Sequence, residues 1–314
     1  IESDIKAEID KSWSLAESSS FSNSTIKDEL SDVYQKHDFI KKDNIKTKEL
    51  RFIDAISEAI DFSMSTHNNL IIMGQDIAEY GGVFKVTEGL VNKYGKDRVR
   101  NTPLCESVIL SSALGLSVCG FKSIVEMQFA DFVSTGFNAI VNNLAKSYYR
   151  WGQNSDVTVR MPTGAGVGAG PFHSQSNEAW FTHTPGLKVV YPAFPNDAKG
   201  LLISSIEDPN PVMYFEHKAL YRSVRENVSE NYCNIELGVA NMIRSGNEVT
   251  IISYGMGVHW AISTLDKLNY RDADLIDLRT LVPLDFELIK ISLKKTGKLI
   301  ILQEDCHIGG FASH

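Results

Sequence analysis

Strand-like and helix-like segments alternate along this sequence from Glu49 to Gln303. The first helix-like segment, residues 52–60, has apolar residues at helical spacing, and the apolar run Asn69–Gly74 follows it. The same order then recurs several times. Because strands that are joined in sequence by helices lie parallel in one sheet, the pattern predicts an α/β fold whose mostly parallel sheets are covered on both faces.

A polar and irregular stretch, residues 217–245, interrupts this alternation and separates two predicted α/β domains at 49–216 and 246–314. Residues 1–35 contain an amphipathic helix with one modest apolar stripe. The lysine-rich residues 36–48 predict a solvated linker. We expect the second domain to be incomplete and the chain to be part of a longer polypeptide.

The composition excludes several classes of function. A formal net charge of -8 over 314 residues gives no basic face for nucleic acid or anionic membrane. No apolar run approaches the roughly 18 residues of a membrane span, and the first residues lack a signal-peptide pattern. The four cysteines form no C-x-x-C pair, which argues against a zinc site and fits a reducing compartment. We therefore expect a soluble, cytoplasmic protein.

The first candidate for chemistry is Glu106, the last residue of Asn-Thr-Pro-Leu-Cys-Glu. It opens a helix that is apolar nearly all round and is therefore predicted to be buried, with Val108, Ile109, Leu110, Ala113, Leu114 and Leu116. A carboxyl group at the mouth of a buried helix has its charged form disfavoured, so it can keep a proton and donate it to a ring nitrogen. The alternative is a solvated acid that interacts favourably with the helix dipole.

The second candidate is His173, at the end of a glycine-rich loop. Glycines at two-residue intervals in 163–171 do not give G-x-G-x-x-G, so a dinucleotide site is not predicted. A flexible loop accounts for the glycines alone. A loop backbone that approaches a ligand closely, with His173 directed into the pocket, also accounts for Gly-Pro-Phe-His-Ser-Gln-Ser at 170–176. Both candidates follow strands, where open α/β sheets bind ligands.

These stretches resemble the β chain of the thiamine-dependent 2-oxo acid dehydrogenase component, most closely the branched-chain (2-oxoisovalerate) type. The resemblance implies a pyrimidine-binding transketolase-like domain at 49–216 and a transketolase C-terminal-like domain at 246–314. The similar stretches are residues 94–99, 101–106, 128–132, 173–181, 185–190, 197–202, 276–283 and 309–313.

The resemblance implies oxidative decarboxylation of a branched-chain 2-oxo acid with thiamine diphosphate, followed by acyl transfer to the lipoyl group of an acyltransferase. Glu106 would hydrogen-bond the aminopyrimidine ring nitrogen. Phe132 would stack on that ring, where relatives often have Tyr, and His173 would steady the substrate carboxylate and assist acyl transfer. The alternatives are a pyruvate dehydrogenase of the same family, another transketolase-like thiamine enzyme, and a non-catalytic assembly subunit, which would lack Glu106 or His173.

Metals and partners are also implied by the resemblance. Residues 1–35 look like the tail of the α chain, so we expect an α–β fusion in which the α part holds magnesium and the diphosphate. Other expected partners are a second β-like chain, in a dimer or α2β2-like assembly, and the lipoyl acyltransferase. The resemblance also implies a structural potassium site, which would use Val157, Thr158, Ser205, Asp208 and Asn210. The alternative is that Asp-Pro-Asn at 208–210 is only a turn that ends a helix.

Overall fold

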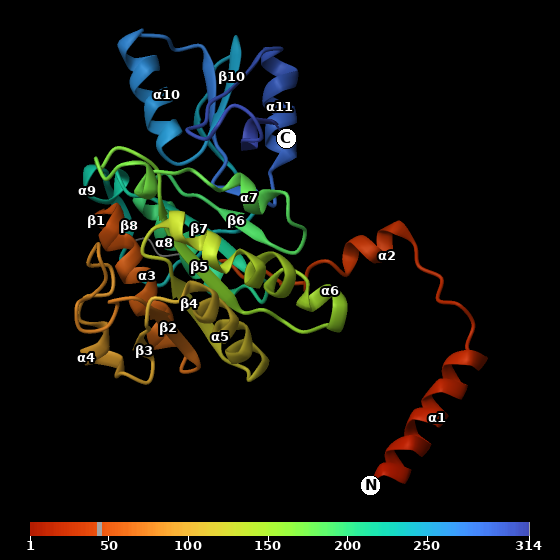
Figure 1. The fold of residues 1–314 in the computed structure, drawn as a ribbon. Coiled ribbons are helices and arrows are strands. Elements are labelled where there is room, and N and C mark those ends of the chain that lie inside the picture. The colour runs from red at the N-terminus through yellow and green to blue at the C-terminus, as the bar shows by residue number, and fades with distance from the viewer. Residues whose placement is uncertain (43–45, 314) are drawn as a thin grey trace. The chain divides into compact units, whose positions relative to one another are not determined.

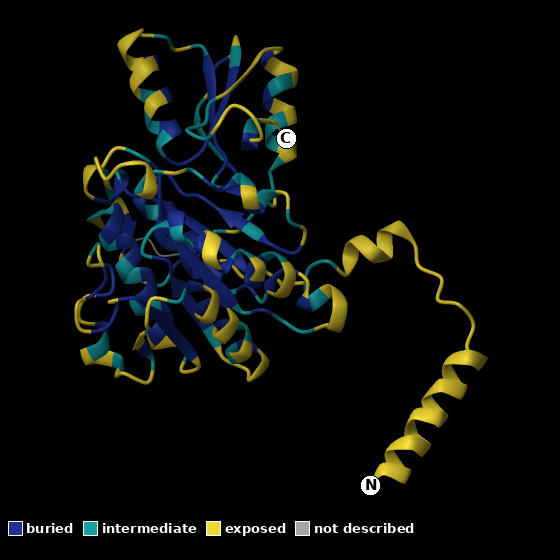
Figure 2. Cartoon of the chain, viewed as in Figure 1, coloured by how far each residue is buried: buried dark blue, intermediate teal, exposed yellow. Residues whose placement is uncertain are grey.

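The computed structural model describes residues 1–42 and 46–313, and the chain divides into two compact units at Val33 and Tyr34. The first unit contains α1 (Glu2–Ser18) and α2 (Ile26–Ser31), neither of which has a buried residue. The amphipathic helix predicted near the N-terminus is α1. Figure 2 shows both helices as exposed along their whole length.

The second unit is built on a seven-stranded sheet in the described part of the chain. All neighbouring strands are parallel except β12 and β6. The strands in the middle of this sheet are buried on both faces, which explains their continuous apolar runs (Figure 2). The spatial order is β12 (Thr280–Val282), β6 (Lys188–Val190), β7 (Val212–His217), β5 (Val157–Thr163), β4 (Lys122–Glu126), β2 (Leu70–Gly74) and β3 (Val99–Asn101).

Helices cover this sheet on both faces because alternate strand residues point to opposite sides. Ile72, Ile124 and Tyr214 belong to one apolar core, together with residues of α3 (Phe52–Thr66) and α8 (Pro195–Glu207). Met73, Val125 and Met213, the adjacent strand residues, belong to a second core with α5 (Glu106–Val118). The shorter helices are α4 (Leu90–Tyr94), α6 (Ser147–Trp151), α7 (Ala179–Thr182) and α9 (Leu220–Ser223).

A smaller sheet follows in the C-terminal part, with α10 (Met256–Lys267) and α11 (Phe286–Thr296) on opposite sides of β10 (Figure 1). Its outer strand β9 is antiparallel to β11, and the other pairs are parallel. The predicted α/β fold with two mostly parallel sheets is therefore confirmed. The strand order is β13 (Leu299–Ile301), β10 (Val249–Ser253), β11 (Ala273–Asp277) and β9 (Asn241–Arg244).

The region predicted to be irregular, 217–245, contains regular structure. It includes α9, β8 (Arg225–Ser229) and β9, and β8 pairs antiparallel with β1 (Thr47–Arg51). In addition, β12 leaves the C-terminal part and joins the large sheet beside β6. Local sequence could not indicate these pairings, because each depends on a strand far away in the chain.

The segment predicted as a solvated linker, 36–48, is mostly exposed, but it belongs to the second unit and is hydrogen-bonded to other parts of it. The Lys42 backbone N–H donates to Asn234 Oδ1 at 2.7 Å, and Lys42 Nζ lies 2.7 Å from Glu207 Oε1. Residues 43–45 lie outside the described part, and β1 begins at Thr47. On either side of residues 43–45, therefore, Lys42 and β1 have defined hydrogen-bond partners. Among the described helices, none has the length and apolar composition needed to span a bilayer.

Candidate functional site

Glu106 is the first residue of α5, and its side chain is buried, with 6% of the residue exposed. Gln75 Nε2 donates a hydrogen bond to Glu106 Oε1 at 3.2 Å, and Thr135 Oγ1 donates to Glu106 Oε2 at 3.2 Å. The predicted burial of Glu106 is thus confirmed, but the reason given for it was wrong. Helix α5 is not buried all round, because Val108 and Val118 on its outer face are more than half exposed.

The cover over Glu106 comes from the 3₁₀ helix η1 (Ala130–Gly136). Gly136 allows this close approach, because a Cβ atom there would lie 2.2 Å from Leu110 Cδ1 and 3.3 Å from the Glu106 carbonyl oxygen. After η1 the chain continues through the π-helical η2 (Ala139–Leu144) and α6. Thr135, which lies in η1, reaches the Glu106 carboxyl group.

Phe132 and His173 belong to one aromatic cluster with Phe129. The His173 ring, at the end of η3 (Pro171–His173), packs edge-on at 4.7 Å from the Phe129 centroid and 5.4 Å from that of Phe132. Phe129 and Phe132 are 5.7 Å apart, also edge-on. Thr135 Oγ1 lies 3.0 Å from the Phe132 carbonyl oxygen as well as near Glu106. The structure therefore brings together all three residues predicted for catalysis and cofactor binding.

Sequence analysis did not single out Gln75, Phe129 or Thr135, although two of them carried a signal. Gln75 immediately follows β2, so it lies at the ligand-binding edge of a parallel sheet. Phe129 lies in the same Gln-Phe-Ala-Asp-Phe stretch as Phe132. The contact of Thr135 with Glu106 depends on the packing of η1 against α5, which has no local sequence signature.

The loop that carries His173 is held at its base. Gly164 has φ +83°, and a Cβ atom there would lie 2.1 Å from His217 Nε2, so this position requires glycine. Thr163 Oγ1 donates to the Gln175 carbonyl oxygen at 3.0 Å, and the Gln175 N–H donates to Asp131 Oδ1 at 3.0 Å. At Gly164 the loop thus approaches the His217 side chain closely, and the close approach of this loop to a ligand stays a prediction.

A cavity of about 390 Å³ lies beside this loop. Its wall includes Gln175 and Trp180 on one side and Glu304 and Asp305 on the other. Nearby, Glu178 is buried and accepts a hydrogen bond from Tyr254 Oη at 2.8 Å, and burial raises the pKa of Glu178 to about 7. The site therefore has a polar opening next to His173 and an acid that can remain protonated near neutral pH.

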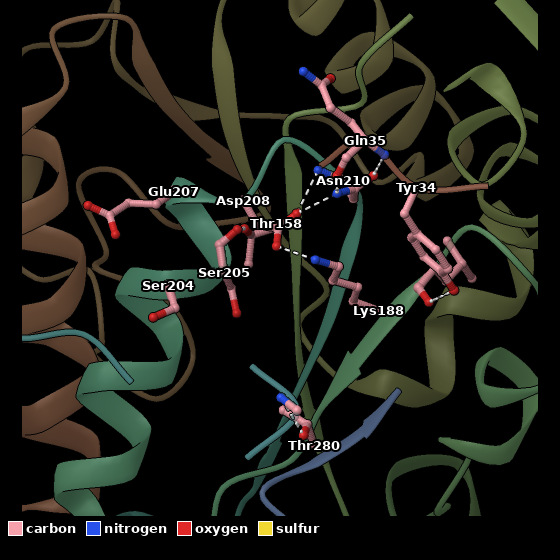
Figure 3. A network of polar contacts seen from close by, with 12 residues as sticks. Tyr34, Gln35, Thr158, Lys188, Ser204, Ser205, Glu207, Asp208, Asn210 and Thr280 are labelled. Atoms are coloured by element: carbon pink, nitrogen blue, oxygen red, sulfur yellow. Dashed lines mark hydrogen bonds and ion pairs between the residues drawn. The ribbon is translucent and has the colours of Figure 1, made fainter. Parts of the chain in front are cut away.

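The residues predicted to bind potassium lie in a separate polar network (Figure 3). Asp208 Oδ1 accepts hydrogen bonds from the backbone and side-chain nitrogens of Asn210 at 2.9 and 2.8 Å, and Asp208 Oδ2 pairs with Lys188 Nζ. Asn210 also exchanges hydrogen bonds with the backbone of Gln35.

The remaining members of the predicted set lie on the neighbouring strand and helix. Thr158 Oγ1 donates to the Ser205 carbonyl oxygen at 3.0 Å, and Val157 precedes Thr158 in β5. Lys188 and Gln35 were not predicted. Within the described residues, no group of three or more His, Cys, Asp and Glu side chains could hold a metal ion.

Known proteins resemble this chain over the same region. The family "Transketolase, pyrimidine binding domain" matches residues 48–224, and "Transketolase, C-terminal domain" matches 238–314. One solved structure, "Split gene transketolase, inactive beta4 tetramer", superposes with a TM-score of 0.70 at 22% identity and covers 84% of this chain and 83% of that one. At this identity, the match supports the fold alone.

Three curated relatives are much more similar in sequence. The 2-oxoisovalerate dehydrogenase subunit beta 2, mitochondrial, of Arabidopsis thaliana is 42% identical over 85% of this chain and 75% of its own length. The 2-oxoisovalerate dehydrogenase subunit beta of Bacillus subtilis is 40% identical (84% and 82%), and the pyruvate dehydrogenase E1 component subunit beta of the same species is 42% identical (85% and 83%). The chain belongs to the family of thiamine-dependent 2-oxo acid dehydrogenase β subunits.

Proposed function

We propose that this chain is the β part of an enzyme that oxidatively decarboxylates a branched-chain 2-oxo acid and transfers the acyl group to the lipoyl group of an acyltransferase. The observation that carries the proposal is the buried carboxyl group of Glu106, held by Gln75 and Thr135 beside the aromatic residues Phe132 and His173. An acid in a protected, partly aromatic site suits a flat nitrogen heterocycle.

The residues present fit thiamine diphosphate, the cofactor that the family implies. Gln75 and Thr135 are neutral donors, so a ring nitrogen can replace either of them at Glu106 without leaving a buried ion unpaired. When bound, the cofactor supplies a carbon nucleophile that adds to the 2-oxo carbon and takes up the electron pair released with carbon dioxide. Glu106 would hold a proton at the aminopyrimidine ring nitrogen.

Phe132 and His173 would have different roles, one toward the cofactor ring and one toward the substrate. Phe132 would present an apolar face to the ring and exclude water from the Glu106 carboxyl. His173, packed edge-on against Phe129 and Phe132, would steady the substrate carboxylate and assist acyl transfer. The acid and the histidine come from different elements, Glu106 from the start of α5 and His173 from the end of η3.

The proposal includes partners that lie outside this chain. An α region would hold magnesium and the diphosphate, a second β-like chain would complete a dimer or α2β2-like assembly, and the acyltransferase would present its lipoyl group. The fusion of α and β parts stays a prediction, because the matched families begin at residue 48. The cytoplasmic location also stays a prediction, because one relative is named as mitochondrial.

Pyruvate dehydrogenase is the second candidate, because a relative of that name is as similar as those named for 2-oxoisovalerate. Steady-state kcat/KM of the complete enzyme, with and without the lipoyl acyltransferase, should be measured for 2-oxoisovalerate, pyruvate and sugar phosphates. We expect the highest value for 2-oxoisovalerate and acyl transfer only when the acyltransferase is present. Preference for pyruvate would favour the second candidate, and activity with sugar phosphates alone would overturn both.

The potassium ion is a separate part of the proposal. In the described structure the Asp208 carboxylate is bonded to Lys188 and Asn210, so an ion would share this carboxylate with the Lys188 ammonium. Potassium chloride should raise the unfolding temperature more than tetramethylammonium chloride does, and Asp208→Asn should remove the difference. Equal effects of the two salts on the unmodified enzyme would show that protein groups alone satisfy this network.

A further inference from the structure

The ammonium group of Lys218 is buried without a hydrogen-bond acceptor. Lys218 directly follows β7, is 4% exposed, and its Nζ has no partner among the described residues. Its backbone N–H donates to the Thr163 carbonyl oxygen at 3.0 Å, which fixes the start of the side chain beside the glycine-rich loop. A buried ammonium of this kind is unusual, because an isolated charge loses its hydration without compensation.

The surroundings of Lys218 compensate only in part. Its Nζ lies 5.6 Å from the centroid of the Phe129 ring, a cation–π distance. Asp131 and Glu304 favour the charged form, but burial outweighs them and lowers the pKa of Lys218 to about 8. Asp131 Oδ2 is also buried without a hydrogen-bond partner. The Asp131 carboxylate therefore acts on the Lys218 ammonium through its charge and not through a hydrogen bond.

Lys218 belongs to the candidate site through its neighbours. Phe129, on which the ammonium lies, is also the ring against which His173 packs at 4.7 Å. Gln175, which is bonded to Asp131, and Glu304 both form part of the wall of the 390 Å³ cavity. Lys218 is not part of that wall, but an anion held at His173 would lie close to its unpaired ammonium group, because both residues contact Phe129.

We infer that Lys218 recognises the carboxylate of the 2-oxo acid, whose oxygens supply the acceptor that the folded chain lacks. This inference rests on the proposed function and names a substrate-binding residue for it. The carboxylate is present both in the bound substrate and in the transition state for addition to the 2-oxo carbon, so the contact stabilises both alike, and its loss raises KM without changing kcat.

The kinetic test uses the complete enzyme with Lys218→Met, Lys218→Arg and the control Lys199→Met. Lys199 is also fully buried, but its Nζ is bonded to Glu58 Oε2 at 3.0 Å and to the Ser229 carbonyl oxygen at 2.6 Å. We expect Lys218→Met to raise KM for 2-oxoisovalerate by about 10- to 100-fold with kcat changed by less than about twofold. Arginine should recover part of this loss, and Lys199→Met should leave KM unchanged.

The binding test needs no turnover. Thermal unfolding of the complete enzyme without thiamine diphosphate is followed with 2-oxoisovalerate or its uncharged methyl ester. We expect the acid, but not the ester, to raise the unfolding temperature of the unmodified enzyme, and neither to protect Lys218→Met. Without ligand, Lys218→Met should unfold at the same or a higher temperature, whereas Lys199→Met should unfold at a lower one.

Three outcomes would overturn the inference. The first is an unchanged KM in Lys218→Met. The second is equal protection of the unmodified enzyme and Lys218→Met by the acid. The third is equal destabilisation by Lys218→Met and Asp131→Asn with protection intact in both, which would identify a structural Lys218–Asp131 pair. If Lys218→Met does not fold, Lys218→Gln replaces it. Absence of any 2-oxo acid turnover by the unmodified enzyme would instead contradict the proposed function.

Discussion

Two buried charged residues lie only two positions apart at the end of β7, and they differ in how completely they are hydrogen-bonded: Glu216 within the strand and Lys218 just after it. Glu216 shares the fully buried Arg160 with Glu126: Arg160 Nε and Nη2 donate to Glu216 at 2.7 Å each, and Nη1 donates to Glu126. Lys218, just beyond the strand, has no acceptor. The Arg160 network joins three strands, whereas the Lys218 ammonium has hydrogen-bond donors without an acceptor.

The difference follows from position in the sheet. Within the sheet, Arg160 on β5 lies between β4 and β7, so strand neighbours on both sides supply its carboxylates. Beyond the carboxyl ends of the strands, the chain enters loops and the next strand no longer supplies a partner at fixed register. Satisfied buried charges therefore indicate structure here, and unsatisfied ones indicate a place for a ligand.

The largest effect is expected at Glu106. Glu106→Gln in the complete enzyme should lower kcat by about a hundred- to ten-thousand-fold, because an amide cannot hold and return the proton at the cofactor ring. The unfolding midpoint and circular dichroism should stay unchanged, because glutamine can still accept a bond from Gln75 or Thr135. The exposed Glu88→Gln is the control. An unaltered rate would remove Glu106 from the mechanism.

Arg160→Met tests the fully bonded side of the comparison. It should lower the free energy of unfolding by about 3–5 kcal/mol, because Glu126 and Glu216 would be left buried without their cation. Urea denaturation measures the change, with the exposed Arg100→Met as control. Adding Glu126→Leu and Glu216→Leu should restore part of the loss. A loss below about 1 kcal/mol would mean that this network is not what holds the three strands.

Gly136→Ala tests the packing that positions Thr135 over Glu106. We expect a loss of about 1–3 kcal/mol in the free energy of unfolding, because the added methyl group would overlap Leu110. Gly115→Ala, in α5 and with nothing within 4 Å of the new Cβ, should instead stabilise by about 1 kcal/mol. Equal effects of the two substitutions on denaturant unfolding would contradict the proposed close approach.

Glu178→Gln should change the pH dependence of stability by a smaller amount. Burial raises the pKa of Glu178 from 4.5 to about 7, so the folded state keeps a proton that the unfolded state releases. The Glu178 contribution is present below pH 4.5 and is lost as pH rises to 7. Between pH 5 and pH 8, the free energy of unfolding of Glu178→Gln should therefore fall by about 2 kcal/mol less than that of the unmodified enzyme, as measured by urea unfolding. Parallel curves for both proteins would refute it.

Much of the fold could be predicted because its signals are local. The strand β2 was expected within one residue of where it lies, because a short apolar run and the glycine that ends it show directly in the sequence. The 3₁₀ helix η1 and the π helix η2 were not expected, because their geometry depends on packing against α5. The pairings of β8 with β1 and of β12 with β6 join distant segments and were not foreseen.

The sequence by itself determined the order of strands and helices, the likeness to a thiamine enzyme, and the candidates Glu106, Phe132 and His173. Only the tertiary structure decided that Gln75 and Thr135 hold the Glu106 carboxyl from 31 and 29 positions away, and that Lys218 is left without an acceptor. The physical reason is that apolar periodicity is written along neighbouring residues. Whether a buried polar atom finds a partner depends on which distant segments the fold brings beside it.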